Sequence, residues 1–168
     1  MSAPSSPEKR RPEACLHPER LGPIRVQVGT NKMFVKVGHT IQIPVRVKGV
    51  CDLAAFHFGL AFNPRVARLV RVEQTPFLAG DPPVEIAFQG LRPGAGQQTI
   101  MGARPPGTGT VDGIGTLARL VFVGWTTGMT TIRLTRLHLQ DGERREFRSF
   151  QVPVDLFVRP DHAPAGRR

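Results

Sequence analysis

The sequence predicts an all-β fold, a two-sheet sandwich built from about nine strands. Apolar and polar residues alternate along many short runs, as they do in strands that bury one face and expose the other. The 18 glycines and 16 prolines of the 168 residues concentrate between these runs. The connections are too short for crossover helices, so the strands are expected to stack as two sheets.

The clearest alternation lies in two neighbouring runs. Apolar residues occupy every second position from Ile41 to Val47, and again from Phe56 to Phe62. Because proline cannot donate a backbone hydrogen bond, Pro44 predicts that the first of these strands is an edge strand or is bulged there. The other predicted strands are Ile24–Val28, Met33–Val37, Arg68–Val72, Val84–Phe88, Thr99–Ala103, Leu117–Val123, Thr130–Leu139 and Phe147–Val158.

Turn-forming pairs separate these strands. Asn63-Pro64, Pro82-Pro83 and Pro93-Gly94 break the middle of the chain, and Asp141-Gly142 is suited to a hairpin turn.

The two ends of the chain lack the alternation of the strands. Residues 1–22 mix proline, serine and charge without periodicity and are predicted to form a flexible leader, residues 160–168 a flexible basic tail, and residues 23–159 one folded domain.

The formal net charge of +10 raises the question of anionic partners. Many of the cations lie in the two tails or singly on polar strand positions, which is typical of a solvated surface. The sequence contains no recognised nucleic-acid-binding module, and its basic residues are not interleaved with aromatic residues that could stack on bases. Nucleic acid is therefore not an expected partner. No segment has the length of apolar sequence that spans a bilayer, and residues 1–22 contain no apolar core of a secretory signal.

Residues that carry catalysis or bind metals form no convincing group. Cys15 and Cys51 are the only cysteines, and because Cys15 lies in the leader, two unpaired thiols are expected. Cys51 and His57 are the one nearby thiol and imidazole, but no oxyanion segment accompanies them. The five histidines are too widely spaced for a local metal motif. The sequence therefore predicts no enzyme, no catalytic residue, no metal site and no cofactor.

Several motifs, in this order, resemble cohesin modules. The segment VKVGHTIQIPVRVKGVCDLAAFHFGLAFNPRVARLVRVE has the Val-x-x-Gly-x-Thr turn, the strand centred on proline and the aromatic strand that ends at Asn63-Pro64. The segment ARPPGTGTVDGIGTLARLVFVGW has a Gly-Thr-Gly loop and a Leu-Ala-x-Leu-x-Phe strand, and MTTIRLTRLHLQDGE has a Thr-x-Ile-x-Leu strand and an Asp-Gly turn. The resemblance covers roughly Ile24 to Val158.

The resemblance implies a nine-stranded jelly roll that serves as receptor for a dockerin, a small calcium-dependent helical module of another protein. Calcium is therefore expected on the partner, because this chain has no Asp-x-Asp-x-Asp-Gly loop that ends in glutamate. The resemblance also implies an extracellular or cell-surface location, although without a visible signal peptide the cytoplasm stays open as an alternative. No membrane span is expected.

The same resemblance implies a partner-binding face on one sheet. Matched residue by residue, it falls on Ala55, His57, Gly59, Met101, Ala103, Arg104 and Gly107. Three of these depart from the family pattern, which has asparagine at Ala55, aspartate at His57 and an acidic residue at Arg104. A cation in place of acidic acceptors repels the usual partner, so an unusual dockerin or another protein is expected.

The alternative interpretation is a carbohydrate-binding or adhesive surface domain, because one fold serves many ligands. The single tryptophan and the absence of tyrosine weaken this alternative. An exposed row of aromatic side chains would favour it.

Overall fold

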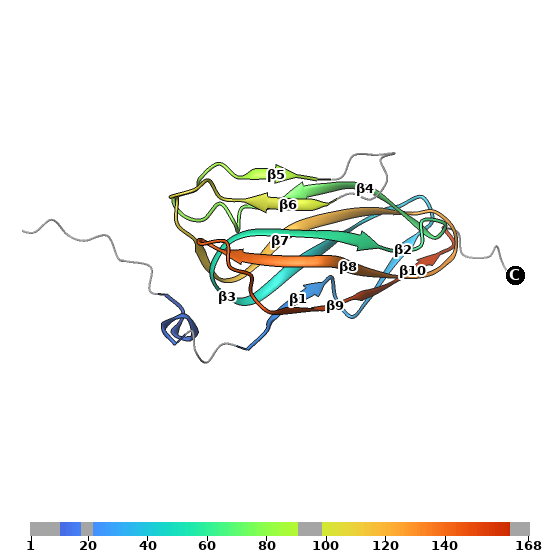
Figure 1. Ribbon diagram of the computed structural model, residues 1–168. Helices are drawn as coiled ribbons and strands as arrows, with labels where there is room; N and C mark the ends of the chain where they lie inside the picture. The colour runs from blue at the N-terminus through green and yellow to red at the C-terminus, as the bar shows by residue number, and fades with distance from the viewer. Residues whose placement is uncertain (1–10, 18–21, 91–98, 162–168) are drawn as a thin grey trace, which may run out of the picture.

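The computed structural model describes residues 11–17, 22–90 and 99–161. Within these ranges the regular secondary structure is strand apart from one short 3-10 helix, η1 (Glu13–Leu16). The strands run along one long axis, with η1 at one end and the end of the last strand at the other (Figure 1). The predicted all-β sandwich is confirmed. No helix in the described ranges is long and apolar enough to cross a bilayer.

The strands are numbered in chain order. They are β1 (Ile24–Val28), β2 (Lys32–Lys36), β3 (Thr40–Ala61), β4 (Ala67–Gln74), β5 (Ala87–Gln89), β6 (Ile100–Ala103), β7 (Val111–Gly124), β8 (Gly128–Asp141), β9 (Ser149–Val152) and β10 (Val154–Arg159).

Strand β3 is long enough to belong to both layers of the sandwich. Its first half pairs with β1 and β7, and its second half, from Leu53 to Ala61, pairs with β6 and β8. Shifts in the β3–β7 register on either side of Val50 mark the bend between the halves. One layer therefore has the order β9–β1–β3–β7–β4, and the other has the order β2–β10–β8–β3–β6–β5.

The core lies between these layers. Ile43 from the first half of β3 and Phe58 from the second half are both 0% exposed, so the two alternating runs point inward as predicted. Burial of large side chains from both layers is the main source of the free energy of folding. Other large, fully buried side chains are Leu53, Ile100, Leu117, Leu120, Phe122, Ile132, Leu134, Leu139 and Leu156.

Pro44 lies in a central strand. Its backbone nitrogen, which carries no N–H to donate, faces the point where β1 ends. The Pro44 carbonyl accepts a 2.7 Å hydrogen bond from the backbone N–H of Gly29, the residue after β1. The nitrogen and carbonyl of one strand residue point to the same side, so the missing N–H faces the end of β1. The β3–β7 register shifts between Val45 and Arg46. The extra residue at this shift is Leu117 of β7, because Val45 pairs with Ala118 and Arg46 pairs with Thr116. Strand β3 is therefore neither an edge strand nor bulged at Pro44, in contrast to the prediction.

The division into strands differs from the prediction at several points. The two runs that start at Ile41 and Phe56 form the single strand β3, whereas the last predicted strand is divided into β9 and β10 at Pro153. Gly29 adopts φ of 59°, a left-handed conformation that ends β1 and turns the chain into β2. The predicted turn at Pro93-Gly94 lies outside the described residues.

Residues 11–17 differ from the flexible leader that the composition suggests. They form η1 and pack against β3, and Cys15 within them is only 4% exposed. A side chain buried this deeply gives the segment a fixed place on the sandwich. The domain limits and the remainder of the two predicted tails stay predictions.

Candidate functional site

Four strands of one layer present a shallow surface to solvent. Their registers align two rows of outward side chains across β5, β6, β3 and β8. We call this surface the central face, and its residues are Ala87, Ala103, Ala55 and Gln140 in one row, Gln89, Met101, His57 and His138 in the next, and Gly59 beyond them.

Small residues make up much of the central face. They are alanine and glycine, and side chains this small let another backbone approach closely. Met101 rises above these small residues and is 39% exposed. Met101 and His57 lie opposite each other in the β3–β6 register, so the exposed apolar group and the imidazole are neighbours at the middle of the face.

A histidine pair and a carboxylate form the polar centre of this face. His57 lies opposite His138 in the β3–β8 register, and Nδ1 of His138 is 2.6 Å from Oε1 of Glu146. Burial lowers the pKa of His57, and the charge of His138 lowers it further, while Glu146 opposes both effects. The centre therefore gains positive charge when the solution is acidified.

The structure brings together five of the predicted contact residues: Ala55, His57, Gly59, Met101 and Ala103. The other two lie beyond the end of β6. Gly107 is an exposed turn residue with φ of 82°. Sequence reasoning did not identify His138 or Gln140, whose positions depend on the register of β8.

Arg104 does not offer its charge to the central face. Its Nη1 donates hydrogen bonds of 2.8 and 2.9 Å to the carbonyls of Leu78 and Ala79, and its Nη2 donates one of 2.6 Å to Thr108. Its Nε donates one of 3.0 Å to Gly109. Burial lowers the pKa of the guanidinium. Arg104 therefore joins two loops beside the face, and its role as a partner contact stays a prediction.

The two cysteines form a disulfide, which corrects the expectation of unpaired thiols. Cys15 and Cys51 are joined with their Cα atoms 5.4 Å apart, a separation typical of disulfides. The bond fixes η1 to β3 near the bend of that strand. Since Cys51 carries no free thiol in this state, it cannot act as a nucleophile with His57.

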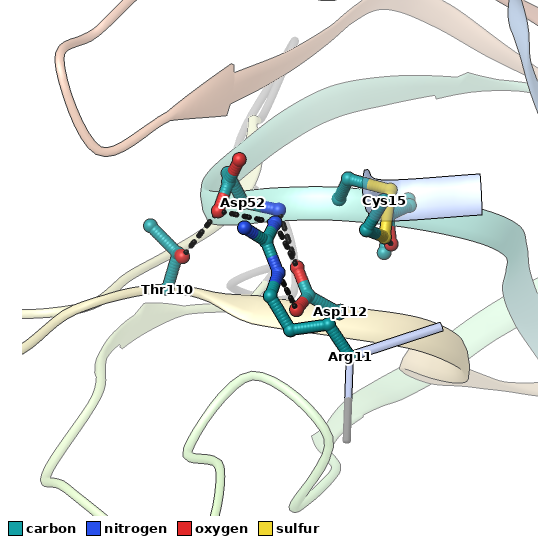
Figure 2. A network of polar contacts seen from close by, with 7 residues as sticks. Arg11, Cys15, Asp52, Thr110 and Asp112 are labelled. Carbon is teal, nitrogen blue, oxygen red and sulfur yellow. Dashed lines mark hydrogen bonds and ion pairs between the residues drawn. A yellow bond between two sulfur atoms is a disulfide. The ribbon is translucent and has the colours of Figure 1, made fainter. Parts of the chain in front are cut away.

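An ionic cluster lies beside the disulfide, as Figure 2 shows. Nε of Arg11 is 3.0 Å from Asp112, and Nη2 of Arg11 is 3.0 Å from Asp52. The Asp112 carboxylate also accepts a 2.7 Å hydrogen bond from the backbone N–H of Asp52, and Thr110 donates a 3.2 Å hydrogen bond to Asp52. The hydrogen bond to Asp112 is the main cause that raises the pKa of Arg11. These contacts hold the leader segment against the sandwich.

The ionic cluster is poorly suited to metal binding or catalysis. Ligand atoms of Cys15, Cys51 and Asp112 lie within 4.8 Å of one another, but both sulfurs belong to the disulfide and Asp112 is paired with Arg11. A cleft of about 640 Å³ adjoins the cluster and is also lined by Phe77 and Arg104. The guanidinium of Arg104 is engaged with carbonyls, so it is not available to stabilise a developing charge.

Comparison with known proteins identifies the fold. No protein-family model matches the chain, and no curated protein sequence matches it. Among solved structures, the seventh ScaB type I cohesin of Pseudobacteroides cellulosolvens is 16% identical, with a TM-score of 0.65 over 87% of this chain and 97% of that one.

Two further structures give the same result. The Coh-OlpC–Doc435 type I cohesin–dockerin complex of Clostridium thermocellum matches at 15% identity and a TM-score of 0.65, over 82% of this chain and 94% of that one. A non-cellulosomal cohesin of the hyperthermophilic archaeon Archaeoglobus fulgidus matches at 14% identity and a TM-score of 0.63, over 82% and 91%. The chain therefore has the fold of cohesin modules.

Proposed function

We propose that this chain is a non-catalytic protein–protein interaction module that docks a dockerin-like partner on its central face. The observation that carries the proposal is the alignment of Ala55, His57, Gly59, Met101 and Ala103 on one outward side of the sheet, where Met101 is exposed and the others are half-buried. The cohesin fold supports it, because the same sequence resemblance that predicted this fold also predicted these contact residues.

The shape of the central face suits a helical partner. Small residues on rigid, paired strands form a surface that is ordered before binding, so little conformational entropy is lost on docking. Met101 and His57 stand at its centre, where a few desolvated contacts supply most of the binding free energy in protein interfaces. We expect one helix of the partner to lie across these two residues.

The chemistry of the face sets the kind of dockerin that it accepts. His57 stands where the family pattern has an acidic acceptor, and Ala55 replaces an amide that would donate and accept hydrogen bonds. A partner adapted to this face offers an apolar side chain opposite Met101 and a hydrogen-bond acceptor opposite His57. Calcium, in this proposal, is held by the partner.

We further propose that the protein works outside the cell or at the cell surface. The disulfide between Cys15 and Cys51 supports this location, because such bonds persist in oxidising compartments and are rare in the cytosol.

A direct binding experiment tests the proposed function. The full chain is titrated by calorimetry with each protein of the source genome that carries duplicated calcium loops, in calcium and in a chelator. We expect at least one such protein to bind in calcium only. The substitution Met101→Glu should then weaken binding by about tenfold or more, because it places a charge at the centre of a desolvated contact.

The matched control is Ile114→Glu, which introduces the same charge at an exposed apolar residue of β7 outside the central face. Binding by this variant should equal that of the parent chain. If no protein with calcium loops binds, or if both variants bind as the parent does, the proposed docking function is wrong.

The carbohydrate alternative has weaker support. Trp125 is exposed, but the guanidinium of Arg68 lies 3.5 Å from its ring centroid and covers one ring face. Sugar platforms use open ring faces, whereas the rings of Phe34 in β2 and Phe157 in β10 stack on each other.

A further inference from the structure

A second exposed surface lies on the same side of the sheet as the central face. In the registers of β8, β10 and β2, Met129 lies opposite Phe157, and Phe157 lies opposite Phe34. Met129 is 50% exposed and Phe34 is 49% exposed. We call these three residues the aromatic row. An unbroken line of large apolar side chains across three strands is uncommon on a solvated surface.

Strand β8 connects the two surfaces. Its first half pairs with β10 and its second half pairs with β3, and Ile132, Leu134 and Leu139 along it all point into the core. Side chains that alternate with these core residues, such as Met129, Arg133 and His138, therefore face outward from one sheet. A single partner can lie across the central face and the aromatic row together.

The rings of the aromatic row contact each other and a cation. Phe34 and Phe157 stack with centroids 5.2 Å apart and planes at 23°, and the guanidinium carbon of Arg159 lies 4.2 Å from the Phe34 centroid. The row therefore offers apolar surface beside a cation. This arrangement suits aliphatic side chains with carboxylates next to them.

Cations flank the aromatic row. Lys36 and Arg159 are opposite each other on one side of it, and Lys32 and Asp155 are opposite each other on the other side. Asp155 is already an acceptor, since the Thr131 hydroxyl donates a 2.7 Å hydrogen bond to it. The surroundings of the row are therefore positively charged, and a negatively charged partner is complementary.

A hollow extends the row toward the central face. It has a volume of about 410 Å³ and is lined by Ala61, Phe62, Met129 and Arg133, among others. The lining is mixed, because Asn63, Thr130 and Thr131 lie beside the apolar groups and Arg133. Such a hollow can accept an aliphatic side chain that has a carboxylate nearby.

We propose that the aromatic row and its flanking cations bind an acidic amphipathic segment of a protein, as a second contact region of the partner that docks on the central face. Apolar side chains of the segment contact Phe34, Phe157 and Met129, and its carboxylates pair with Lys36 and Arg159. The assignment to that partner rests on the proposed docking function, whereas the chemistry of the bound segment rests on the row itself.

Two synthetic helical peptides test this chemistry. They share the same leucine stripe, and their polar positions carry glutamate in one peptide and lysine in the other. The full chain, labelled with nitrogen-15, is titrated with each peptide and followed by NMR. We expect the glutamate peptide to shift the amide signals of Phe34, Phe157 and Met129 in a saturable way and to bind about tenfold more tightly than the lysine peptide.

Two variants and their matched controls complete the test. Phe34→Ser should weaken binding of the glutamate peptide by about tenfold, and the double variant Lys36→Glu, Arg159→Glu should reverse the preference between the peptides. The controls Ile114→Ser and the double variant Arg46→Glu, Lys48→Glu make the same changes at exposed positions of the other layer and should leave binding unchanged.

Several results would overturn the inference. Equal binding of the two peptides, shifts confined to other surfaces, or binding of vesicles containing phosphatidylserine without binding of the glutamate peptide each contradict it. So does a self-association that Phe34→Ser abolishes, since the row would then be a contact between copies of this chain. If neither peptide binds the aromatic row while a dockerin-like protein still binds the central face, this inference is wrong and the proposed docking function is unaffected.

Discussion

The imidazole rings of His57 and His138 stack across β3 and β8, with their centroids 4.4 Å apart and their planes at 27°. Two groups that both become cationic in acid thus lie in contact at the middle of the central face. Glu146, whose Oε1 is 2.6 Å from Nδ1 of His138, supplies an opposite charge nearby. Burial opposes protonation of His57 most strongly and the charge of His138 adds to this effect, so the pKa of His57 is lowered.

This pKa shift predicts a pH dependence of stability. The folded pKa of His57 lies below its ordinary value of 6.5, so below that pH the unfolded chain binds the proton more readily than the folded one. The contribution of His57 to the free energy of unfolding is complete above pH 6.5 and falls as the pH decreases through the folded pKa. Urea unfolding at about pH 8 and about pH 5 should show the loss in acid.

The substitution His57→Gln isolates this contribution from that of the carboxylates. The variant removes the titrating group, so its free energy of unfolding should fall less on acidification than that of the parent chain. An equal fall in the two proteins would contradict the prediction.

The hydrogen bonds of Arg104 predict that replacing this residue lowers the stability of the fold. Its guanidinium donates to four backbone carbonyls, those of Leu78, Ala79, Thr108 and Gly109. Arg104→Ala leaves these acceptors without their charged donor, and we expect the free energy of unfolding to fall by about 2–4 kcal/mol. The urea midpoint measures the loss.

The control for this substitution is Arg119→Ala, at an exposed arginine of β7. Surface truncations of this kind change stability by about 0.5 kcal/mol or less. If the Arg104 variant is no less stable than the Arg119 variant, the two loops are held by other contacts.

A larger residue at Gly102 is expected to overlap with the core directly beneath the central face. A Cβ atom added there would lie 2.7 Å from the Phe56 ring, which is buried. Gly102→Ala should therefore lower the free energy of unfolding by about 1–3 kcal/mol. Gly22→Ala is the control, because a Cβ there meets nothing within 4 Å. Equal stability of the two variants would show that the Phe56 ring moves without cost.

The fold could be predicted because burial and chain periodicity agree in this sequence. Ile43 and Phe58 lie in runs whose alternation can only bury one face if the chain is extended. The limits of the strands could not be predicted to the same degree. Pairing with strands that are distant in the sequence decides whether the chain continues through Val50 as one bent strand. The same kind of pairing decides whether a strand is divided at Pro153.

The candidate site was predicted only in part, for the same physical reason. Alternation places His57 on the outer face, but its neighbour His138 depends on the register of β8. Arg136, with φ of 48°, lies where the β3–β8 register shifts, and a slip of one residue there would turn His138 inward. Likewise, nothing in the sequence near Arg104 shows that its guanidinium meets carbonyls of a loop more than twenty residues before it.

The disulfide was missed because the residues around Cys15 have no hydrophobic pattern. Its partner Cys51 lies near the bend of β3, and the two are 36 residues apart. Cross-linking a loop of this length restricts the unfolded chain, and the loop-closure model gives a stabilisation of about 3–4 kcal/mol. We therefore expect the double variant Cys15→Ser, Cys51→Ser to unfold at a clearly lower urea concentration than the parent chain.

Reductant provides the matching control for this last prediction. It should lower the urea midpoint of the parent chain toward that of the double variant and should leave the variant unchanged. A thiol assay of the unfolded, unreduced parent chain should detect no free cysteine. Two reactive thiols in that assay, or a parent chain that reductant does not destabilise, would show that Cys15 and Cys51 are not joined in solution. The proposal that the protein works outside the cytosol would then lose its structural support.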